Sequence, residues 1–231
     1  MEILNILKSI ESSGVFSVYG KEGFCIPGLQ VSGFGEVALP LPTAEAERLL
    51  SFAAKAPYGK GADTVYDETV RKVHQIDSSK LSFANETWAQ LLQKVTESIR
   101  EGLGISKGEV VPTLYKLLLY QQGDFFLPHQ DSEKQPGMFA SLVITLPSKH
   151  EGGQLIVSHA GETQVYSFGD AANLYDIQYA AFYADCEHEV KPLISGYRLS
   201  LVYNLSLEIS GKKLSVSSVD FSKEIDQIAR D

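Results

Sequence analysis

Short apolar runs recur roughly every ten residues along the second half of the chain, and Gly, Pro and polar residues separate them. Each run has the length of a strand and is rich in β-branched and aromatic residues. We expect strands at residues 113–120, 139–146, 154–158, 162–168, 171–175, 180–185, 188–193 and 197–207. Short strands in this number predict two facing sheets, that is, a jelly roll or double-stranded β-helix.

The first part of the chain, residues 1–109, mixes helical and strand-like spacing of its hydrophobic residues. A short amphipathic helix is predicted at residues 3–10. Short strands are expected at residues 15–19, 23–26 and 36–39, and a strand-like stretch at residues 71–76. This region is therefore predicted to be a mixed α/β support for the β-rich part.

Two longer helices are predicted within this support region. Thr43 is expected to cap a helix that runs to about Lys55 and is stopped by Pro57. Asn85 is expected to cap another, which ends at Gly102 and whose apolar side is formed by Trp88, Leu91, Leu92, Val95 and Ile99. Both helices are expected to pack against the outside of the main sheet.

The chain as a whole is predicted to be one compact domain, mainly β with flanking helices. Its 231 residues are 44% hydrophobic, which suffices for a substantial core. Residues 1–109 form the N-terminal α/β support, residues 110–219 a cupin-like, double-stranded β-helix core, and residues 220–231 a polar tail with the pattern of a helix start.

The composition of the chain limits the classes of partner and the cellular compartment that we expect. The net charge of -9, with basic residues scattered among more numerous acids, makes nucleic acid a poor candidate partner. No apolar run could span a bilayer, and the start of the chain lacks the basic region of a secretory signal. The two cysteines, Cys25 and Cys186, exclude a disulfide framework and suit a reducing compartment. We therefore predict a cytoplasmic protein, or a nuclear one in a eukaryote, of open oligomeric state.

The candidate chemistry begins with His129 and Asp131. Side chains two residues apart on a strand point to the same face, so this pair can contact one ion if residues 125–131 are extended. Pro128 favours an extended conformation at Leu127, which stiffens the approach to the pair. A lone His-x-Asp pair is a weak signal, because such pairs also arise by chance.

A second histidine and an arginine follow at the end of the β-rich part. His188 comes after an aromatic, strand-like run, and Arg198 lies near the start of the last predicted strand, on the same face as Ser200. Two imidazoles and one carboxylate can hold iron(II) and leave coordination positions open, and they also suit zinc with an open water position. The planar guanidinium of Arg198 matches a carboxylate in a bidentate pair.

Together these residues resemble the iron(II)- and 2-oxoglutarate-dependent dioxygenases of the prolyl 4-hydroxylase type, over roughly residues 110–207. The resemblance rests on His129-x-Asp131, His188, Arg198 ten residues further on, Tyr120-x-x-Gly123-x-x-Phe126-x-x-His129 and Glu151-Gly152-Gly153-Gln154-Leu155. It implies that the two histidines and the aspartate bind iron, and that Arg198 and Tyr120 bind the distal carboxylate of 2-oxoglutarate.

Two departures from the family pattern concern the prolyl substrate. Phe126 stands where many members have a second tyrosine, so a hydroxyl is missing there, and Arg198 stands where collagen-type enzymes have lysine. The resemblance implies hydroxylation of a protein, peptide or amino-acid-like substrate, with dioxygen consumed, succinate and CO2 formed, and ascorbate as a candidate reductant. Residues expected to form an apolar wall around the reaction are Phe125, Phe126, Leu142, Ile144, Phe182 and Leu199.

Other functions remain open on the residues alone. An oxygenase acting on a small metabolite is the close alternative. A zinc hydrolase would use the same two histidines and aspartate, but it needs a general base and leaves Arg198 without a task. A catalytically silent cupin-like module is disfavoured, because three converging polar side chains are unfavourable without a metal to hold.

Several further residues have a plainer interpretation. His74, His150 and His159 lack a ligand context and are predicted to be surface or hydrogen-bonded core histidines. Cys186 shares a strand face with His188, yet a small buried thiol is the favoured interpretation. Residues 57–70 form a loop that could close over the site or remain an ordinary solvent loop, and its candidate substrate-recognition residues are Tyr58, Lys60, Tyr66 and Arg71.

Overall fold

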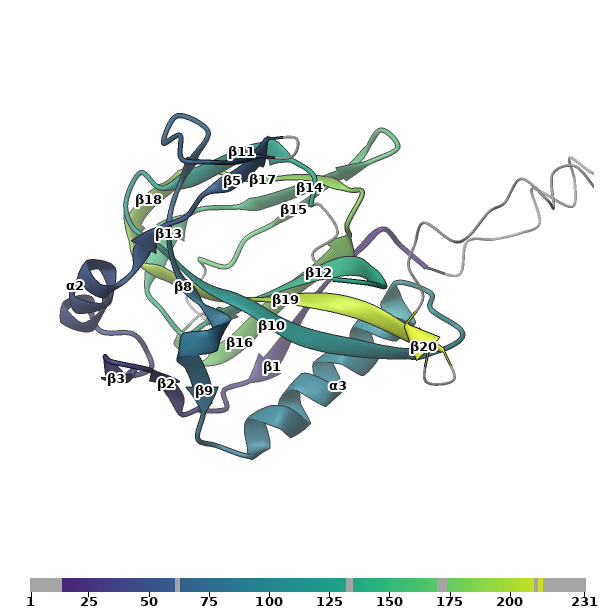
Figure 1. Cartoon of the computed structure of the whole chain (residues 1–231), viewed down its shortest axis with the longest axis horizontal. Helices are drawn as coiled ribbons and strands as arrows, with labels where there is room; N and C mark the ends of the chain where they lie inside the picture. Colours follow the sequence, from purple (N-terminus) through teal and green to yellow (C-terminus); the bar gives the residue numbers. More distant parts are fainter. Residues whose placement is uncertain (1–13, 61–62, 132–134, 170–173, 210–211, 214–231) are drawn as a thin grey trace, which may run out of the picture.

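The computed structural model describes residues 14–60, 63–131, 135–169, 174–209 and 212–213 (Figure 1). The helix expected at residues 3–10, the polar tail at residues 220–231 and most of the strand expected at residues 171–175 lie outside the described residues. No helix in the described part is long and apolar enough to cross a bilayer.

Two antiparallel sheets face each other, as the recurring strand pattern predicts (Figure 1). The larger sheet has the order β1 (Ser17–Gly23), β16 (Asp176–Tyr183), β12 (Met138–Leu146), β19 (Arg198–Ile209), β10 (Glu109–Tyr120), β8 (His74–Asp77) and β4 (Ala54–Lys55), with β20 (Lys212–Lys213) beside β19. The smaller sheet has the order β15 (Glu162–Tyr166), β14 (Leu155–His159), β17 (Glu187–Val190), β11 (Phe125–His129) and β7 (Arg71–Lys72). This confirms the jelly-roll fold class.

Three small sheets complete the described strands. They are β13 (His150–Gly152) with β18 (Leu193–Gly196), β3 (Gly35–Glu36) with β2 (Leu29–Val31) and β9 (Leu81–Phe83), and β5 (Tyr58–Lys60) with β6 (Asp63–Val65). A short 3-10 helix, η1 (Ser78–Lys80), precedes β9. The sequence pattern missed β13 and β18, because strands of three or four residues are too short to show a period.

Strand boundaries near the start of the chain differ from the expected ones. The strand expected at residues 15–19 is shifted toward the C-terminus and becomes β1, where it pairs with β16 along its whole length. Residues 24–28 are not in a strand, although residues 23–26 were expected to be. The strand expected at residues 36–39 is reduced to β3. These strand boundaries are decided by pairing with strands far along the chain. The local sequence pattern contains no information about that pairing.

The helix α3 (Thr87–Gly102) covers the outer face of the larger sheet (Figure 1). It starts two residues after Asn85, whose Oδ1 accepts hydrogen bonds from the backbone N and the hydroxyl of Thr87. Asn85 therefore accepts from the backbone N–H of Thr87, which has no partner within the helix. It lies one residue before Glu86, the usual N-cap position. Trp88, Val95 and Ile99 are buried against the sheet.

The helix α2 (Thr43–Phe52) is shorter than expected and is not capped by a Thr43 side chain. Thr43 is its first residue, the preceding position is Pro42, and no side chain bonds to the first turn. The helix ends at Phe52 because residues 54–55 pair with β8 as the edge strand β4. Ala46 and Leu49 are fully buried in the same cluster as the buried face of α3, so both helices support the larger sheet.

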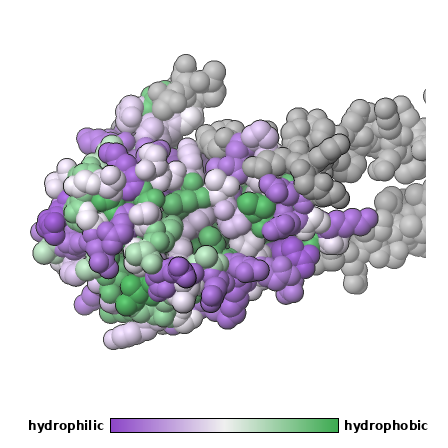
Figure 2. Space-filling model, turned by 60° about the horizontal axis from the view of Figure 1, so that its bottom comes forward, coloured by the Kyte–Doolittle hydropathy of each residue, from purple (hydrophilic) through white to green (hydrophobic). Residues whose placement is uncertain are grey.

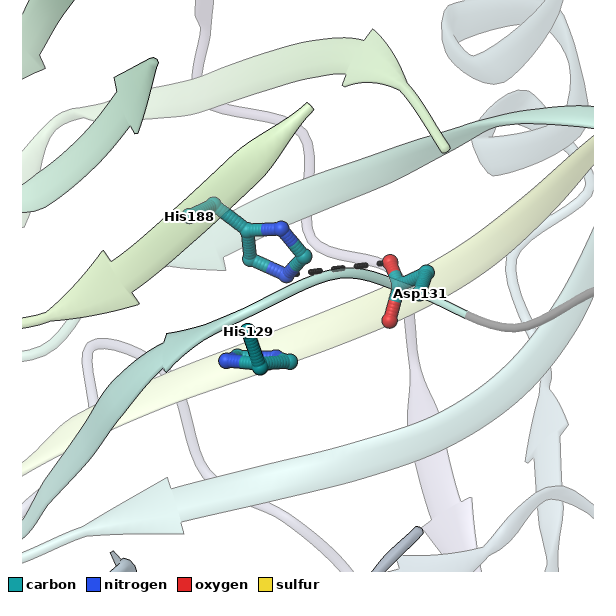
Figure 3. A group of neighbouring side chains, drawn as sticks. All are labelled: His129, Asp131 and His188. Atoms are coloured by element: carbon teal, nitrogen blue, oxygen red, sulfur yellow. Dashed lines mark ion pairs between the residues drawn. The ribbon is translucent and has the colours of Figure 1, made fainter. Parts of the chain in front are cut away.

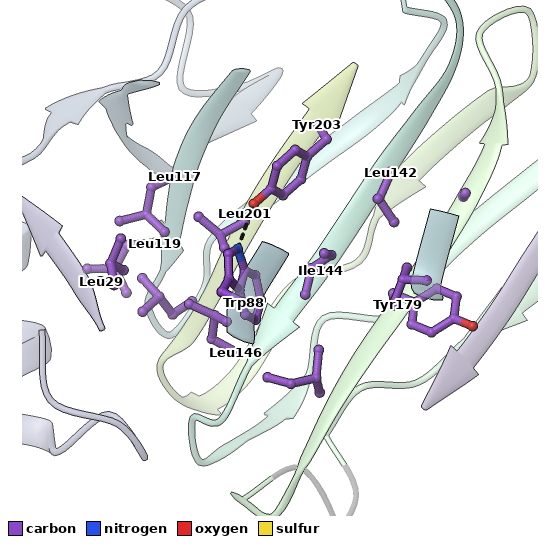
Figure 4. Packing of buried hydrophobic residues seen from close by; sticks show 14 of the residues in the cluster. Leu29, Trp88, Leu117, Leu119, Leu142, Ile144, Leu146, Tyr179, Leu201 and Tyr203 are labelled. Carbon is purple, nitrogen blue, oxygen red and sulfur yellow. Dashed lines mark hydrogen bonds between the residues drawn. The ribbon is translucent and has the colours of Figure 1, made fainter. Parts of the chain in front are cut away.

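The larger sheet buries both of its faces, with different partners. The outer face forms the main core with the helices, through residues that include Leu117, Leu119, Leu142, Ile144, Leu146, Leu199, Leu201 and Tyr203 (Figure 4). The inner face forms a second cluster with the smaller sheet, through residues that include Leu118, Tyr120, Phe126, Leu155, Val157, Ala180, Phe182 and Val190. On the face seen in Figure 2, hydrophobic and hydrophilic residues are interspersed.

The main core contains one buried hydrogen bond between aromatic side chains. Trp88 Nε1 donates to the hydroxyl of Tyr203 at 3.2 Å (Figure 4). Both residues are 2% exposed, and burial raises the pKa of Tyr203 to about 12. The bond ties α3 to β19, the central strand that also carries Arg198.

We predict that Tyr203→Phe lowers the free energy of unfolding by about 1 to 3 kcal/mol, because Trp88 Nε1–H is left buried without an acceptor. Urea unfolding followed by the fluorescence of Trp88, the single tryptophan, measures the change. Tyr66→Phe is the matched control, since Tyr66 is 69% exposed. Equal stability of the two variants would contradict the importance of this bond.

Candidate active site

The structure brings His129, Asp131 and His188 together. His129 is the last residue of β11, and His188 lies opposite it as its antiparallel partner in β17. One ligand atom from each of the three residues lies within 4.8 Å of the others, and His188 Nε2 is 3.7 Å from Asp131 Oδ2 (Figure 3). The centroids of the two imidazole rings are 4.1 Å apart.

Asp131 reaches this group by a different route from the one expected. The pairing of β11 shifts register between Phe126 and His129, and the strand ends at His129, so Asp131 follows the strand instead of sharing a face within it. Ser141 Oγ, in β12, donates to Asp131 Oδ2 at 2.5 Å and holds the carboxylate in place. Ser141 was not predicted as part of the site, because a single serine in an apolar strand carries no signal of this contact.

Both histidines present the same nitrogen to the shared space. His129 Nδ1 lies 2.8 Å from the carbonyl of Leu127, and His188 Nδ1 lies 3.2 Å from the carbonyl of Cys186. A carbonyl accepts, so each Nδ1 carries the hydrogen and each Nε2 keeps its lone pair. Burial, together with the nearby His188, lowers the pKa of His129 to about 3, so the ring stays neutral.

This donor set can hold a divalent metal. Two neutral imidazole nitrogens and one carboxylate oxygen suit iron(II) or zinc, with positions left open. Metal–ligand bonds are roughly 2.1 Å, so one ion can contact both His188 Nε2 and Asp131 Oδ2 across their 3.7 Å separation. The orientation of each ligand by a hydrogen bond is the arrangement that metal-binding histidines and carboxylates usually have.

Arg198 lies at the start of β19 and is 1% exposed. Its Nη1 donates to the carbonyl of Gly153 at 2.5 Å and its Nε donates to Ser200 Oγ at 3.2 Å. No described carboxylate lies within ion-pair distance of it, and burial lowers its pKa. A guanidinium that is buried without a counter-ion is unfavourable, so this position is suited to binding an anion.

The carbonyl group that accepts the hydrogen bond from Arg198 belongs to Gly153, and the backbone conformation at this position favours glycine. Gly153 has a φ of 65°, and a Cβ there would lie 2.7 Å from Leu193 Cδ1 and 3.6 Å from Arg198 Nη1. A larger residue would therefore strain the backbone and displace the end of the Leu193 side chain, while its Cβ would meet the guanidinium only at an ordinary contact distance. This is the physical reason for the glycine in the Glu151-Gly152-Gly153 motif.

Tyr120 is 2% exposed, and the guanidinium carbon of Arg198 lies 5.1 Å from the centroid of its ring. The Tyr120 hydroxyl makes no hydrogen bond within the described part of the chain. Burial raises the pKa of Tyr120, so the hydroxyl stays protonated and can donate. Tyr120 and Arg198 therefore offer free donors to the same space.

One cavity of about 370 Å³ is lined by all five of these residues, that is, by His129, Asp131, His188, Arg198 and Tyr120. Its apolar lining comes from the facing sheets: Leu118, Phe126, Val143, Leu155, Phe182, Val190 and Val202. The ring of Phe126 stacks on His129 with centroids 3.4 Å apart, and Phe182 lies 4.4 Å from His188. The proposed ligands thus have apolar neighbours, and polar residues, among them Arg71, Tyr115, Gln130 and Asn204, form other parts of the wall.

Four of the six residues expected to form the apolar wall were wrong. Phe126 and Phe182 line the cavity, whereas Leu142, Ile144 and Leu199 lie in the main core on the opposite face of the larger sheet, and Phe125 is not part of the lining. On β12 the residues that face the cavity are Ser141 and Val143, each one position before the expected Leu142 and Ile144. The error has a simple cause, since successive side chains alternate faces and both faces of this sheet are buried.

The segment at residues 57–70 contributes part of the cavity wall. It contains the hairpin of β5 and β6, and Tyr58 and Arg71 line the cavity. Tyr66 points into solvent, being 69% exposed, and the side chain of Lys60 lies outside the described residues. That this segment closes over a bound molecule stays a prediction.

His150 and His159 have the plainer roles expected of them, whereas His74 is half-buried and its Nδ1 makes no hydrogen bond with any described residue. His74 lies 3.9 Å from the buried carboxylate of Asp124, and His150 is buried with Nδ1 2.8 Å from the carbonyl of Ser148. His159 is exposed. It forms a second group with Asp185 and Cys186, but the Cys186 thiol is fully buried and burial raises its pKa to about 11. The thiol therefore stays protonated and is a poor ligand.

A match to a known protein family agrees with the donor set of this site. Residues 115–206 match the family model described as the 2OG-Fe(II) oxygenase superfamily. No curated protein matches the sequence significantly.

Three solved structures are similar at low identity. A Pseudomonas putida prolyl-4-hydroxylase has 19% identity and a TM-score of 0.49, with 90% of this chain and 100% of that chain covered. A Trichoplax adhaerens prolyl hydroxylase, in complex with a hypoxia inducible factor peptide fragment, has 16% identity and a TM-score of 0.46, with 77% and 84% covered. A 2OG-Fe(II) oxygenase family oxidoreductase from Burkholderia pseudomallei has 20% identity and a TM-score of 0.44, with 75% and 81% covered.

We predict that Cys186 does not react with thiol reagents in the native protein at pH 8. With a pKa of about 11 only roughly one thiol in a thousand is ionised at that pH, and the sulfur is buried as well. Labelling of Cys25→Ser should then require denaturant, while Cys186→Ser retains the partly exposed thiol of Cys25. Rapid labelling of native Cys25→Ser would contradict the prediction.

Proposed function

We propose that this chain, whose residues 115–206 match the 2OG-Fe(II) oxygenase superfamily, is a dioxygenase of the prolyl 4-hydroxylase type that hydroxylates a protein, peptide or amino-acid-like substrate. The observation that carries the proposal is the meeting of His129, Asp131 and His188 in one cavity with the buried, unpaired Arg198. A metal site beside a free guanidinium suits a co-substrate that both chelates a metal and carries a distant carboxylate.

In this proposal His129, Asp131 and His188 hold iron(II). When bound, iron(II) and 2-oxoglutarate supply oxidative decarboxylation, in which one oxygen atom of O2 enters succinate, the other enters a C–H bond of the substrate, and CO2 leaves. The carbonyl groups of Leu127 and Cys186 keep both Nε2 lone pairs directed at the metal position. Ser141 fixes the Asp131 carboxylate by donating to Oδ2.

Arg198 and Tyr120 bind the distal carboxylate of 2-oxoglutarate. The guanidinium has two of its nitrogens held by Gly153 and Ser200, which fixes its plane and leaves the third free for the anion. The Tyr120 hydroxyl, kept protonated by burial, adds a second donor. The carboxylate in turn neutralises a guanidinium that is otherwise buried without a partner.

The apolar lining excludes water from the reaction. Phe126 and Phe182 flank the two histidines, and Val143, Leu155 and Val202 extend the wall. Apolar side chains beside the ligands limit the loss of oxidising power to solvent, so that more of it is spent on the substrate C–H bond.

The same cavity argues against a zinc hydrolase. Such an enzyme needs a general base beside the metal-bound water. Among the described residues that line the cavity, Asp131 is the sole carboxylate, and the two histidines are the proposed ligands. Among the described lining residues no carboxylate or imidazole outside the proposed ligand set is therefore left as a general base, and Arg198 would have no role.

We expect the metal-free protein to form succinate from 2-oxoglutarate when iron(II), ascorbate and O2 are supplied. Succinate and remaining 2-oxoglutarate are measured by chromatography, with zinc in place of iron(II) as the parallel arm. His188→Ala removes one ligand and should abolish succinate formation. Absence of both succinate formation and 2-oxoglutarate binding in the wild-type protein would overturn the proposed function, and hydrolytic activity with zinc alone would favour the alternative.

We expect Arg198→Ala to raise the 2-oxoglutarate concentration needed for half-saturation by about 30-fold or more, because truncating one partner of a buried charged pair costs roughly 2 to 5 kcal/mol. Arg198→Lys keeps the charge but not the planar fork, so an intermediate value is expected. Circular dichroism of each variant checks folding. Saturation by 2-oxoglutarate that is unchanged in Arg198→Ala would remove Arg198 from the co-substrate site.

A further inference from the structure

The cavity holds a second arginine that the proposed co-substrate site does not use. Arg71, in β7, lies opposite Phe126 in β11, and its guanidinium carbon is 4.4 Å from the centroid of the Phe126 ring. That ring in turn stacks on His129. Arg71 is therefore placed beside the proposed metal ligands and on the cavity wall.

The guanidinium of Arg71 is held in place along one edge. Its Nη1 donates to the carbonyl of Pro57 at 2.6 Å. Its Nε is buried without a hydrogen-bond partner, and no described residue accepts a hydrogen bond from Nη2. The edge formed by Nε and Nη2 is one of the two edges by which a guanidinium binds a carboxylate with two parallel hydrogen bonds.

No counter-ion accompanies this charge. Within the described part of the chain no carboxylate lies at ion-pair distance from Arg71, and burial lowers its pKa. Arg48 shows the usual alternative: its guanidinium also lies over a ring, that of Phe34, but it is exposed and paired with Glu45. Keeping a desolvated guanidinium unpaired is unfavourable, which favours a bound anion at this position.

The charges of the remaining cavity point the same way. With iron(II) and 2-oxoglutarate bound, as the proposed function requires, the charges of the metal, Asp131, the co-substrate and Arg198 cancel. Arg71 and Lys116 are the other charged residues of the lining, and Lys116 Nζ donates to Gln75 Oε1. The loaded cavity thus keeps two surplus positive charges, on Arg71 and Lys116, and Arg71 is the one whose guanidinium lies over the ring of Phe126 beside His129.

We propose that Arg71 binds a carboxylate of the substrate through its Nε and Nη2 edge, and that the enzyme therefore selects substrates with a carboxylate close to the hydroxylated carbon. This inference rests on the proposed function. The carboxylate belongs either to a free organic or amino acid, or to an acidic side chain or C-terminus of a peptide. Neutral analogues leave the half-buried Arg71 without a counter-ion and its buried Nε without an acceptor, so they are rejected.

The test is made with wild-type protein loaded with iron(II), 2-oxoglutarate and ascorbate. One arm receives a small-molecule extract and the other a peptide digest of the same cells, and mass spectrometry detects molecules that gain one oxygen atom only when 2-oxoglutarate is present. Methyl esterification of each mixture before the reaction removes the carboxylates. We expect oxygenated molecules that carry a carboxylate, and we expect esterification to abolish their formation.

Variants connect this selectivity to Arg71. Arg71→Gln removes the charge, and we expect oxygenation of the identified acid at subsaturating concentration to fall about 30-fold or more, as for other buried charged pairs that lose a partner. The fall should lie mostly in KM, and Arg71→Lys should restore part of it. Arg48→Gln is the matched control outside the cavity and should match the wild-type protein.

Binding of 2-oxoglutarate, measured by calorimetry, separates this inference from the proposed function. Unchanged co-substrate affinity in Arg71→Gln together with lost oxygenation supports it. If Arg71→Gln loses 2-oxoglutarate affinity as strongly as it loses oxygenation, Arg71 belongs to the co-substrate site and the inference is overturned. It is also overturned if wild-type protein forms succinate but oxygenates no carboxylate-bearing molecule, if esters react as well as acids, or if Arg71→Gln oxygenates the acid like wild type. Wild-type protein without succinate formation or 2-oxoglutarate binding defeats the proposed function itself.

Discussion

The antiparallel pairing of β11 with β17 is the constraint on which the rest of the site depends. It sets His129 opposite His188, although 58 residues separate them along the chain. Directly paired residues on neighbouring strands have Cβ atoms about 5 Å apart, which is close enough for two imidazoles to share an ion. A slip of one residue would turn one ring to the other face of the sheet. The hydrogen bonds from the two Nδ1 atoms and from Ser141 refine this arrangement, but the register creates it.

The two faces of the larger sheet have different roles: the outer face forms the main core, and the inner face lines the cavity of the candidate site. Its outer face is packed against α2 and α3 with aliphatic and aromatic side chains, and its inner face shares a cavity with the smaller sheet. That cavity contains unfavourable features, namely two guanidinium groups without carboxylate partners and a histidine kept neutral at low pH by burial. Well-packed surroundings are needed to hold such groups in place, because a free polar group would otherwise relax toward water. The unpaired charges are best understood as positions for ligands.

Much of the fold and site could be predicted because local patterns carry the relevant information. Recurring apolar runs indicated the jelly roll, and the face that Arg198 was expected to share with Ser200 is confirmed by the hydrogen bond from Arg198 Nε to Ser200 Oγ. Alternation also explains the main error. Leu142 and Ile144 were expected in the cavity, and the structure has Ser141 and Val143 there, because an apolar strand that is buried on both faces gives no sign of which face is which.

By itself the sequence identified His129, Asp131, His188 and Arg198 as candidate ligands of a metal and an anion, since they have the donor atoms and the family spacing that this chemistry requires. It also determined the length and number of most core strands, because side-chain period and turn residues are local properties. Only the tertiary structure decided how Asp131 reaches the site from beyond the end of β11, that Ser141 holds it, and that Arg71 shares the cavity without a counter-ion. Those features depend on strand register and on which distant segments meet, and such pairings are set by the summed packing of the whole chain.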